Sequence, residues 1–312
     1  MLSSDKVIPM TTVAYLGPAG TFTEEALWRF ADSGCFPDEV TPLPVNSSAE
    51  ALDAVRAGDA DYACVAIENS VDGAVTLTFD SLAEDGVQIY RETDIEVAFS
   101  IMVRPGTQEV RTFSTHPVAR QQVRGWVAEH LPDVEFIAAS SNAAAAQAVA
   151  EGRIDAAAAP RRAAELFGLH TLADGVADVS GARTRFVLVG RPGRPTPRTG
   201  SDRTAVVFTL PNRPGSLVAA LTEFALRGLD MTRIESRPTR TGLGTYRFHV
   251  DLIGHIDDDP VAEALRALYL HCEQLSYLGS WPTLEVVSHT DTHRLAEAAA
   301  WVDAARKGHH SC

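Results

Sequence analysis

Polar residues gather at four places in the first part of the chain, each where the sequence predicts that a strand ends. These places are Gly17–Thr23, Glu68–Ser70, Ser114–Pro117 and Ser140–Asn142. Three of them come directly before a predicted helix, whose free N–H groups and dipole favour an anion. In open α/β sheets, ligands bind beyond the carboxyl ends of the strands. We therefore expect these groups to line one cleft that binds a small anionic molecule.

A fifth polar group, Thr184-Arg185-Phe186, opens the last strand of this region. Arg185 could hold a carboxylate through two parallel hydrogen bonds, or it could form a structural ion pair in this arginine-rich chain. The other groups also have structural alternatives, which are a capped turn at Gly17–Thr23, a polar turn at Glu68–Ser70 and plain helix N-caps elsewhere. Gly17–Thr23 lacks the GxGxxG pattern, so it does not indicate a dinucleotide site.

Other kinds of chemistry find little support in the sequence. There is no GxSxG elbow of the kind that hydrolases use. His289 and His293 flank Asp291 at helical spacing, but no third ligand accompanies them, and we interpret them as solvated surface. The four cysteines lack the spacing of a metal site or a disulfide framework, which predicts a reduced, cytoplasmic protein. We find neither a secretory signal nor an apolar run of membrane-spanning length.

Length and charge narrow the function further. The chain has 312 residues, which suggests two domains, and 27 basic against 41 acidic side chains give a net charge of −14. This balance argues against a nucleic-acid-binding protein, whose phosphate contacts need a basic face. It leaves room for a small anionic substrate, because a local cluster of donors can override the net sign.

Strand and helix patterns alternate through the first 190 residues. Capping boxes, Thr21 with Glu24 and Ser47 with Glu50, begin two of the helices. The predicted strands are Val13–Leu16, Tyr62–Ile67, Val87–Tyr90, Val97–Val103, Val110–Phe113, Val134–Ala139, Ala156–Ala159 and Thr184–Val189. We expect a bilobal domain over residues 11–190, with lobe one at about 11–92 and 178–190 and lobe two at about 93–177.

The pattern changes after this domain. Residues 191–203 are rich in proline and glycine and are typical of a linker. Residues 204–282 follow the order β-α-β-β-α-β, which predicts a ferredoxin-like domain. Residues 283–312 form a polar tail, with a predicted helix at Thr292–Arg306.

Taken in order, several short motifs resemble those of the prephenate dehydratase family. The catalytic motifs are Tyr15–Thr23, Ile67–Ser70 with Gly73, Thr115–Pro117 and Thr184–Phe186. Two later segments, Pro214–Leu217 and Glu235–Pro238, are similar to the signatures of the ACT regulatory domain of this family. The resemblance spans about residues 12–282.

The resemblance implies a two-lobed α/β catalytic domain of the periplasmic-binding-protein type (type II), followed by an ACT domain. The implied enzyme is a lyase that converts prephenate to phenylpyruvate, water and carbon dioxide in phenylalanine biosynthesis, without a metal or cofactor. Phenylalanine would act as allosteric effector through the ACT domain. Family members are homo-oligomers, so we expect a cytoplasmic dimer or tetramer that binds neither nucleic acid nor membrane.

The resemblance also implies roles for single residues. We expect Thr184 to donate a hydrogen bond to the departing ring hydroxyl, while Glu68 orients Asn69, Ser70 or an arginine. The expected catalytic residues are Thr184, Ser70, Asn69 and Glu68. The expected substrate-binding residues are Gly20, Thr21, Phe22, His116, Ser140, Ser141, Asn142, Arg185 and Phe186. The expected phenylalanine-binding residues are Asn212, Gly215, Ser216, Leu217, Glu235 and Ser236.

Within the substrate set, we expect Arg185 and the helix N-termini at Thr21 and Ser141 to bind the side-chain carboxylate, and Phe22 and Phe186 to form an apolar wall. Two other functions stay open. The chain could be a non-catalytic amino-acid sensor with the same cleft, or it could prefer arogenate, the amino analogue of prephenate. Formation of phenylpyruvate from prephenate separates the enzyme from the sensor.

Overall fold

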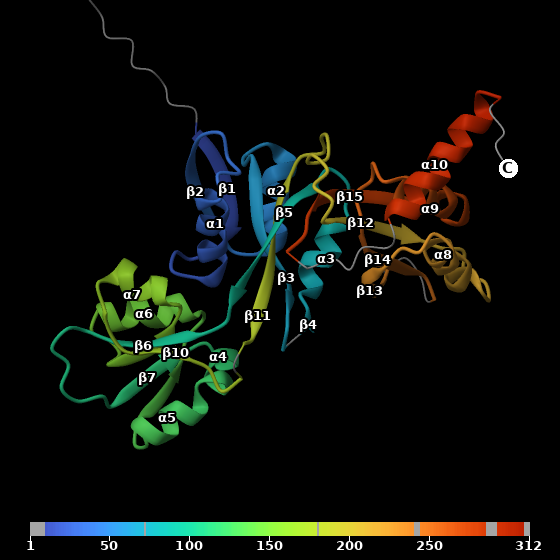
Figure 1. Ribbon diagram of the computed structural model, residues 1–312. Helices are drawn as coiled ribbons and strands as arrows, with labels where there is room; N and C mark the ends of the chain where they lie inside the picture. The colour runs from blue at the N-terminus through green and yellow to red at the C-terminus, as the bar shows by residue number, and fades with distance from the viewer. Residues whose placement is uncertain (1–9, 72, 180, 240–243, 285–291, 309–312) are drawn as a thin grey trace, which may run out of the picture.

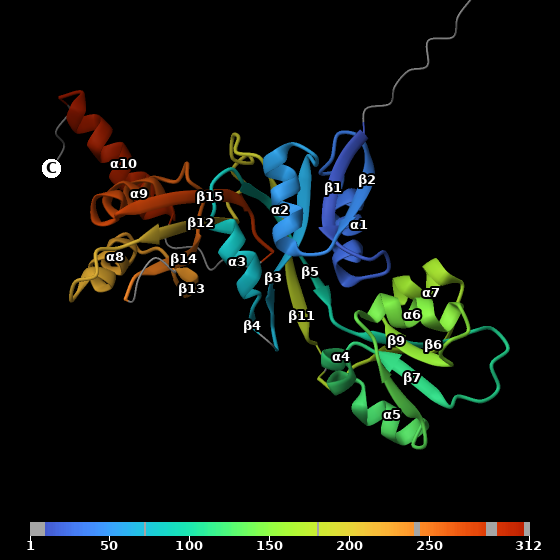
Figure 2. The ribbon, with the colours of Figure 1, turned by 180° about the vertical axis from the view of Figure 1, so that it is seen from behind.

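The computed structural model describes residues 10–71, 73–179, 181–239, 244–284 and 292–308. The chain forms two α/β lobes and a C-terminal domain, each built on its own sheet (Figure 1, and seen from behind in Figure 2). The predicted fold class is confirmed. None of the described helices is long and apolar enough to cross a lipid bilayer.

Lobe one is built on a mixed sheet with the strand order β2-β1-β3-β11-β5. Its strands are β1 (Met10–Leu16), β2 (Glu39–Val45), β3 (Tyr62–Asn69), β4 (Gly73–Ala74), which pairs with β3, β5 (Gln88–Glu96) and β11 (Arg183–Gly190). Its helices are α1 (Phe22–Asp32), α2 (Ser48–Ala57) and α3 (Thr76–Leu82). The two predicted capping boxes begin α1 and α2, where Thr21 and Ser47 accept hydrogen bonds from the backbone N–H groups of Glu24 and Glu50.

Lobe two has a five-stranded sheet with the order β10-β6-β9-β7-β8. Its strands are β6 (Phe99–Val103), β7 (Thr112–Thr115), β8 (Glu135–Ala138), β9 (Ala156–Ala159) and β10 (His170–Val176). Its helices are α4 (Pro117–Gln122), α5 (Arg124–His130), α6 (Asn142–Ala150) and α7 (Arg161–Phe167). The alanines of α6 and β9 form much of one buried cluster, because small side chains let the helix approach the sheet closely.

The C-terminal domain has an antiparallel sheet with the order β13-β14-β12-β15. Its strands are β12 (Asp202–Thr209), β13 (Met231–Pro238), β14 (Tyr246–Ile253) and β15 (Gln274–Pro282), and its helices are α8 (Ser216–Ala225) and α9 (Asp259–His271). One sheet face packs on α8 and α9 through Val206, Phe208 and Val250. The helix predicted in the tail is α10 (Thr292–Arg306), which projects beyond α9 (Figure 1).

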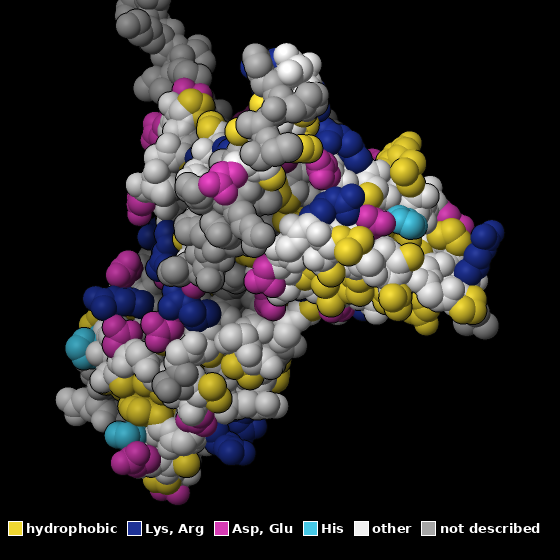
Figure 3. Space-filling model, turned by 45° about the vertical axis from the view of Figure 1, so that its right-hand side comes forward, with side chains coloured by type: hydrophobic (Ala, Val, Ile, Leu, Met, Phe, Trp, Pro, Cys, Tyr) yellow, Lys and Arg dark blue, Asp and Glu magenta, His cyan; other side chains and the backbone are white. Residues whose placement is uncertain are grey.

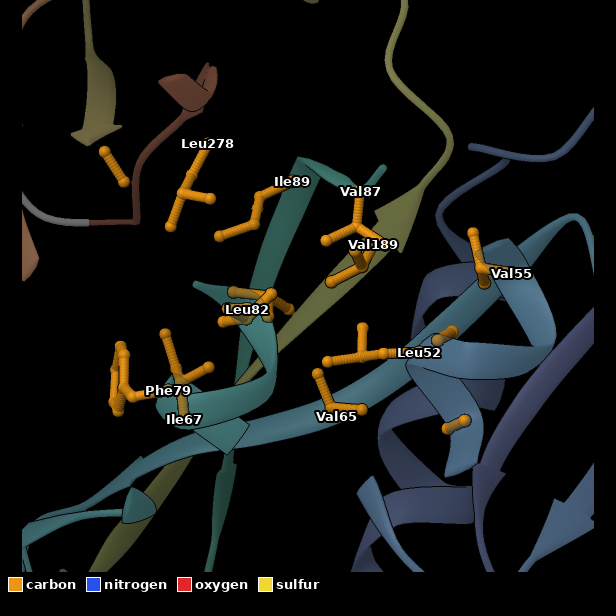
Figure 4. Close-up of a cluster of buried hydrophobic side chains, with 14 of the residues drawn as sticks. Leu52, Val55, Val65, Ile67, Phe79, Leu82, Val87, Ile89, Val189 and Leu278 are labelled. Atoms are coloured by element: carbon orange, nitrogen blue, oxygen red, sulfur yellow. The ribbon is translucent and has the colours of Figure 1, made fainter. Parts of the chain in front are cut away.

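One apolar core runs from lobe one into the C-terminal domain. Leu278 of β15 packs beside Ile89 of β5 and joins the cluster formed by α2, α3 and β3 (Figure 4). Trp281, fully buried, belongs to the same cluster. A Cβ atom at Gly279 would overlap the carbonyl oxygen of Ile89, so the backbones of β15 and β5 approach more closely than a larger residue permits. The C-terminal domain is therefore fixed against lobe one.

The segment predicted as a linker is irregular as far as Ser201, where β12 follows, but it is held at several points. The Tyr90 hydroxyl donates to the Arg191 carbonyl at 2.7 Å. His255 lies 2.8 Å from the Thr196 carbonyl, and Arg198 pairs with Asp258 at 2.6 Å. β5 stays paired with β11 as far as Glu96, so the chain leaves lobe one only after this residue.

Candidate active site

Three predicted site segments lie at the same end of the lobe-one sheet. The parallel strands β1 and β3 both end there, at Leu16 and Asn69. β11 is antiparallel to β3, and Thr184 at its start is paired with Asn69. Strand pairing therefore places the end of β3 beside the start of β11, and strand direction turns the Gly17–Thr21 loop toward the same end of the sheet, although β3 continues beyond the level of Leu16.

Thr184 and Asn69 form a direct side-chain pair. The Asn69 amide donates to the Thr184 hydroxyl oxygen at 3.0 Å, and Thr184 is only 9 % exposed. The amide oxygen of Asn69 accepts from the backbone N–H of Val71 at 2.8 Å, which fixes the orientation of the amide. A hydroxyl has one hydrogen to donate and two lone pairs. Because Asn69 occupies a lone pair, the Thr184 hydrogen is left to donate elsewhere.

Ser70 holds the start of β11 in place. Its backbone N–H donates to the Arg183 carbonyl at 2.8 Å, and its hydroxyl accepts from the Arg183 N–H at 2.9 Å. Arg183 also forms an ion pair with Asp94 on β5. The Ser70 hydroxyl therefore fixes the backbone one residue before Thr184.

The loop before α1 joins the two lobes. The Glu24 carboxylate accepts from the Gly20 N–H at 2.6 Å and from Trp28 Nε1 at 3.2 Å. From lobe two, Arg162 approaches the same carboxylate to 3.4 Å. A Cβ at Gly20 would lie 3.2 Å from the Cβ of Ala163 in α7, so the loop lies directly against lobe two. Glu24 and Arg162 were missed as site residues, because a capping box explains Glu24 without any contact outside α1.

The same loop also reaches the N-terminus of α6. A Cβ at Gly20 would lie 3.6 Å from the Cβ of Ala143. Ser141 caps this helix by accepting from the Ala144 N–H at 3.0 Å. The predicted anion-binding ends of α1 and α6 therefore lie on the two sides of one seam between the lobes.

The remaining predicted residues of lobe two mainly shape the backbone. Asn142 accepts from the Thr115 hydroxyl at 3.0 Å and from the His116 N–H at 3.1 Å, which ties the end of β7 to the start of α6. His116 is the N-cap of α4 and accepts from the Val118 N–H at 3.3 Å. Ser140 is exposed. The geometry of His116 and Ser141 agrees with the N-cap alternative.

The two predicted wall residues have different surroundings. Phe22 is half-buried, packs edge-to-face on Phe99 at 5.6 Å between ring centroids, and contacts the cores of both lobes. Phe186 is 2 % exposed and lies inside the lobe-one core. Phe22 is thus placed at the seam, whereas Phe186 supports the sheet from within and does not form a wall.

Arg185 does not face the same side as Thr184, because successive residues of a strand point to opposite faces. Its guanidinium lies 3.0 Å from Asp251, 3.1 Å from Glu68 and 3.7 Å from Glu92. These carboxylates engage the guanidinium that we expected to bind a substrate carboxylate. Arg185 therefore forms the structural ion pair that we gave as the alternative, and Glu68 orients this arginine.

The predicted effector residues occupy the start of α8 and the edge strand β13. Gly215 precedes α8 with a φ of 85°, in the left-handed region that favours glycine. Asn212 is exposed, and its amide nitrogen lies 2.7 Å from where a Cβ of Gly244 would be. Glu235 and Ser236 are neighbours on β13 and point to opposite faces of the sheet. Ser216 and Leu217 are half-buried in the first turn of α8.

Within the described ranges, no three His, Cys, Asp or Glu side chains group together as a metal site would require; His289 lies outside those ranges.

A crevice of about 320 Å³ lies between α1 and α7 at the seam of the lobes. Its lining residues are Glu25, Trp28, Arg29, Asp32, Arg161, Arg162 and Glu165.

The fold defines a two-lobed α/β protein joined to a ferredoxin-like domain, with a candidate site at the strand ends of lobe one. The prephenate dehydratase family model matches residues 13–194, and the ACT domain model matches residues 204–268. The chain belongs to the prephenate dehydratase family.

Relatives agree along nearly the whole chain. A prephenate dehydratase of Corynebacterium glutamicum is 60 % identical over 306 residues, covering 96 % of this chain and 97 % of the relative. Among solved structures, the prephenate dehydratase of Arthrobacter aurescens in complex with L-Phe is 40 % identical, with a TM-score of 0.83, covering 95 % of this chain and all of that chain. GqqA, described as a novel type of quorum-quenching acylase, is 34 % identical with a TM-score of 0.78, covering 87 % and 98 %.

Proposed function

We propose that the chain converts prephenate to phenylpyruvate, water and carbon dioxide. Prephenate is a dianion whose ring becomes aromatic when the ring carboxylate leaves as carbon dioxide and the ring hydroxyl leaves as hydroxide, which takes up one proton from the solvent to become water. The protein must hold the geometry and help the hydroxyl depart. The observation that carries the proposal is the Thr184–Asn69 pair at 3.0 Å, on the sheet edge that faces lobe two.

In this mechanism Thr184 donates a hydrogen bond to the departing oxygen. A threonine hydroxyl is a weak acid, so we assign it the role of an oriented donor or proton relay. The hydrogen bond from Asn69 polarises the hydroxyl and makes it a better donor. Removing one oriented donor of this kind costs about 3 kcal/mol of transition-state stabilisation.

The substrate carboxylates need other partners, since Arg185 is engaged by Asp251 and Glu68. We propose that the side-chain carboxylate is bound by the N-terminal N–H groups of α1 and α6. These groups follow the N-caps Thr21 and Ser141, and the two helix ends lie on opposite sides of the seam between the lobes. Phe22 shields the ring carboxylate from water, which favours dispersal of its charge as carbon dioxide forms.

We also propose that phenylalanine binds the C-terminal domain near Asn212, Gly215–Leu217 and Glu235, and that it controls activity from there. The L-Phe complex of the Arthrobacter aurescens relative supports this assignment. Backbone donors at the start of α8 suit a carboxylate, and Glu235 suits an ammonium group.

We propose a cytoplasmic homo-oligomer, either a dimer or a tetramer. Large apolar side chains on and beside α8 and α9 support this assembly, because monomers rarely expose many in one region. Val218, Leu226, Tyr269 and Leu270 are each more than two-thirds exposed. Hydrophobic side chains also gather on the C-terminal domain in Figure 3.

The thiols of Cys35, Cys64 and Cys272 are free, which agrees with a reducing compartment.

The test is to incubate the pure protein with prephenate and, in parallel, with arogenate, and to follow phenylpyruvate and phenylalanine formation. Turnover of prephenate supports the proposal, and faster turnover of arogenate would reassign the substrate. Saturable binding of phenylalanine without turnover of either compound would leave the amino-acid sensor.

A further inference from the structure

Two neighbouring cross-strand pairs join β3 to β11 at the site. Thr184 is paired with Asn69, and Arg185 is paired with Glu68. The first pair is polar and lies at the site, whereas the second is an ion pair at 3.1 Å on the opposite face of the sheet. A register irregularity follows directly, between Arg185 and Phe186. Such irregularities re-aim side chains. Because Arg185 lies between this irregularity and Thr184, a change in the backbone at Arg185 also moves Thr184.

The opposite face meets the C-terminal domain through a charged group that we name the interdomain charge cluster. It consists of Glu68, Glu92, Arg185, Arg203, Arg233 and Asp251. Arg185 reaches Asp251 of β14 at 3.0 Å, and Arg233 of β13 approaches Glu68 to 3.6 Å. Each ion pair of the cluster therefore joins two different strands.

The interdomain charge cluster has three carboxylates and three guanidinium groups, so its charges balance. Glu68 is 44 % exposed at its side chain, whereas the side chain of Arg203 is 1 % exposed and that of Asp251 is 7 % exposed. A buried charge that loses its partner is strongly disfavoured. The strands that carry these charges must therefore move together or exchange partners when the C-terminal sheet shifts.

The cluster also adjoins the proposed effector segment. Arg233 lies two residues before Glu235 on β13, on the same face of the strand, and is paired in register with Asp251. A second ion pair, from Arg237 to Asp80 of α3 at 3.0 Å, crosses the same interface. Neither Arg237 nor Asp80 lies on β3 or β11, so this second pair is a matched control.

We propose that Arg185 is a positioning residue for Thr184, and that the interdomain charge cluster couples phenylalanine binding on β13 to the start of β11. The proposal rests on the proposed function and adds the residues through which control passes. When the effector shifts β13, Arg233 changes its hold on Glu68, and the pair Glu68–Arg185 shifts the backbone that carries Asn69 and Thr184. Such coupling is reciprocal, because the substrate must change effector affinity by the same factor.

The first test compares Arg233→Gln with the control Asp80→Asn. In the wild type we expect inhibition by phenylalanine, and weaker phenylalanine binding when prephenate saturates the protein. Arg233→Gln should keep basal kcat/KM and the phenylalanine Kd within about threefold, while the half-inhibitory concentration rises at least about tenfold, as loss of a typical coupling predicts. Asp80→Asn should keep the half-inhibitory concentration within about threefold.

Inhibition of Arg233→Gln at the wild-type concentration would overturn the coupling, as would equal loss of control in Asp80→Asn. Absence of phenylpyruvate formation by the wild type would instead overturn the proposed function. If Arg233→Gln does not fold, Arg233→Lys keeps the charge but is shorter and lacks the guanidinium fork, which weakens the contact with Glu68, and the same limits apply.

The second test addresses positioning directly through Arg185→Lys, which keeps the charge but loses the fork that reaches three carboxylates. We expect kcat to fall at least about tenfold, with KM within about threefold and no change in the far-ultraviolet circular dichroism. An unchanged kcat would overturn the positioning role. A rise in KM with unchanged kcat would also overturn it, because Arg185 would then bind substrate.

Discussion

Thr184 is a small side chain whose usefulness depends on its neighbours. Asn69 fixes its oxygen, and Ser70 fixes the backbone one residue before it. The sequence was sufficient to single out all three, since Asn69 and Ser70 follow a buried strand and Thr184 lies in a motif that resembles one of the family. It could not decide whether Arg185 binds substrate or forms a structural ion pair, because its partner Asp251 lies 66 residues further along the chain. Contacts of such separation leave no local pattern.

Replacing Thr184 tests this arrangement at the residue scale. Thr184→Ala should lower kcat by about 100-fold to 1,000-fold, because it removes one oriented donor, while KM changes little. Thr184→Ser keeps the hydroxyl and is the matched control, with activity well above that of the alanine variant. Steady-state kinetics with prephenate measure both, and equal activity of Thr184→Ala and wild type would remove this hydroxyl from the mechanism.

His249 illustrates how a residue of the interface responds to pH. It is 2 % exposed, and its ring meets Phe79 of α3 at 5.1 Å. Burial, and then the charge of Arg233, lower its pKa from 6.5 to about 4. The charges that face it are Arg233, Asp251, Arg247 and Asp80. The unfolded chain therefore takes up a proton as the pH falls below 6.5, whereas the folded chain does so only near pH 4.

The stability that neutral His249 contributes is thus complete above pH 6.5 and is lost as the pH falls towards 4. Between pH 7.5 and pH 5.0 we expect the wild type to lose about 2 kcal/mol more unfolding free energy than His249→Gln, which cannot take up this proton. Burial raises the pKa of Asp251, and this group is present in both proteins, so the difference reports His249 together with its interaction with Asp251. Urea denaturation at the two pH values measures it, and equal losses in both proteins would contradict the expectation.

At the scale of elements, local signals predicted some helices and strands well and missed others. Capping boxes placed the starts of α1 and α2, and the apolar run of β3 matched a central strand. β2 was missed, because Pro42 and Pro44 argue against a strand and are tolerated here only at a sheet edge. α3 was missed because no side chain caps its start. Its place is set by packing between β3 and the C-terminal domain, which a local pattern does not reveal.

At the scale of the whole molecule, lobe one and the C-terminal domain share one apolar core. Trp281 of β15 is fully buried there, and its indole donates to the Glu92 carboxylate of β5 at 3.0 Å. The sequence predicted two domains from their patterns of strands and helices. It did not reveal that they interlock, because Glu92 and Trp281 lie 189 residues apart.

Trp281→Ala tests this shared core. We expect it to lower the unfolding free energy by about 3 to 5 kcal/mol, because it opens a cavity and removes a donor from buried Glu92. Trp301→Ala is the matched control; Trp301 is 64 % exposed, and its loss should change stability by less than about 0.5 kcal/mol. Urea unfolding followed by circular dichroism measures both, and similar stability of the two variants would show that Trp281 does not hold the domains together.

The close approach of β15 to β5 at Gly279 has a consequence for protein engineering. A regulatory domain from another enzyme could not be fused at residues 191–201 without also matching this interface. A working chimera would have to bring a glycine at that position, an indole to replace Trp281, and a recipient surface carrying Glu92. The catalytic and C-terminal domains of this chain must therefore be exchanged together with the interface between β5 and β15.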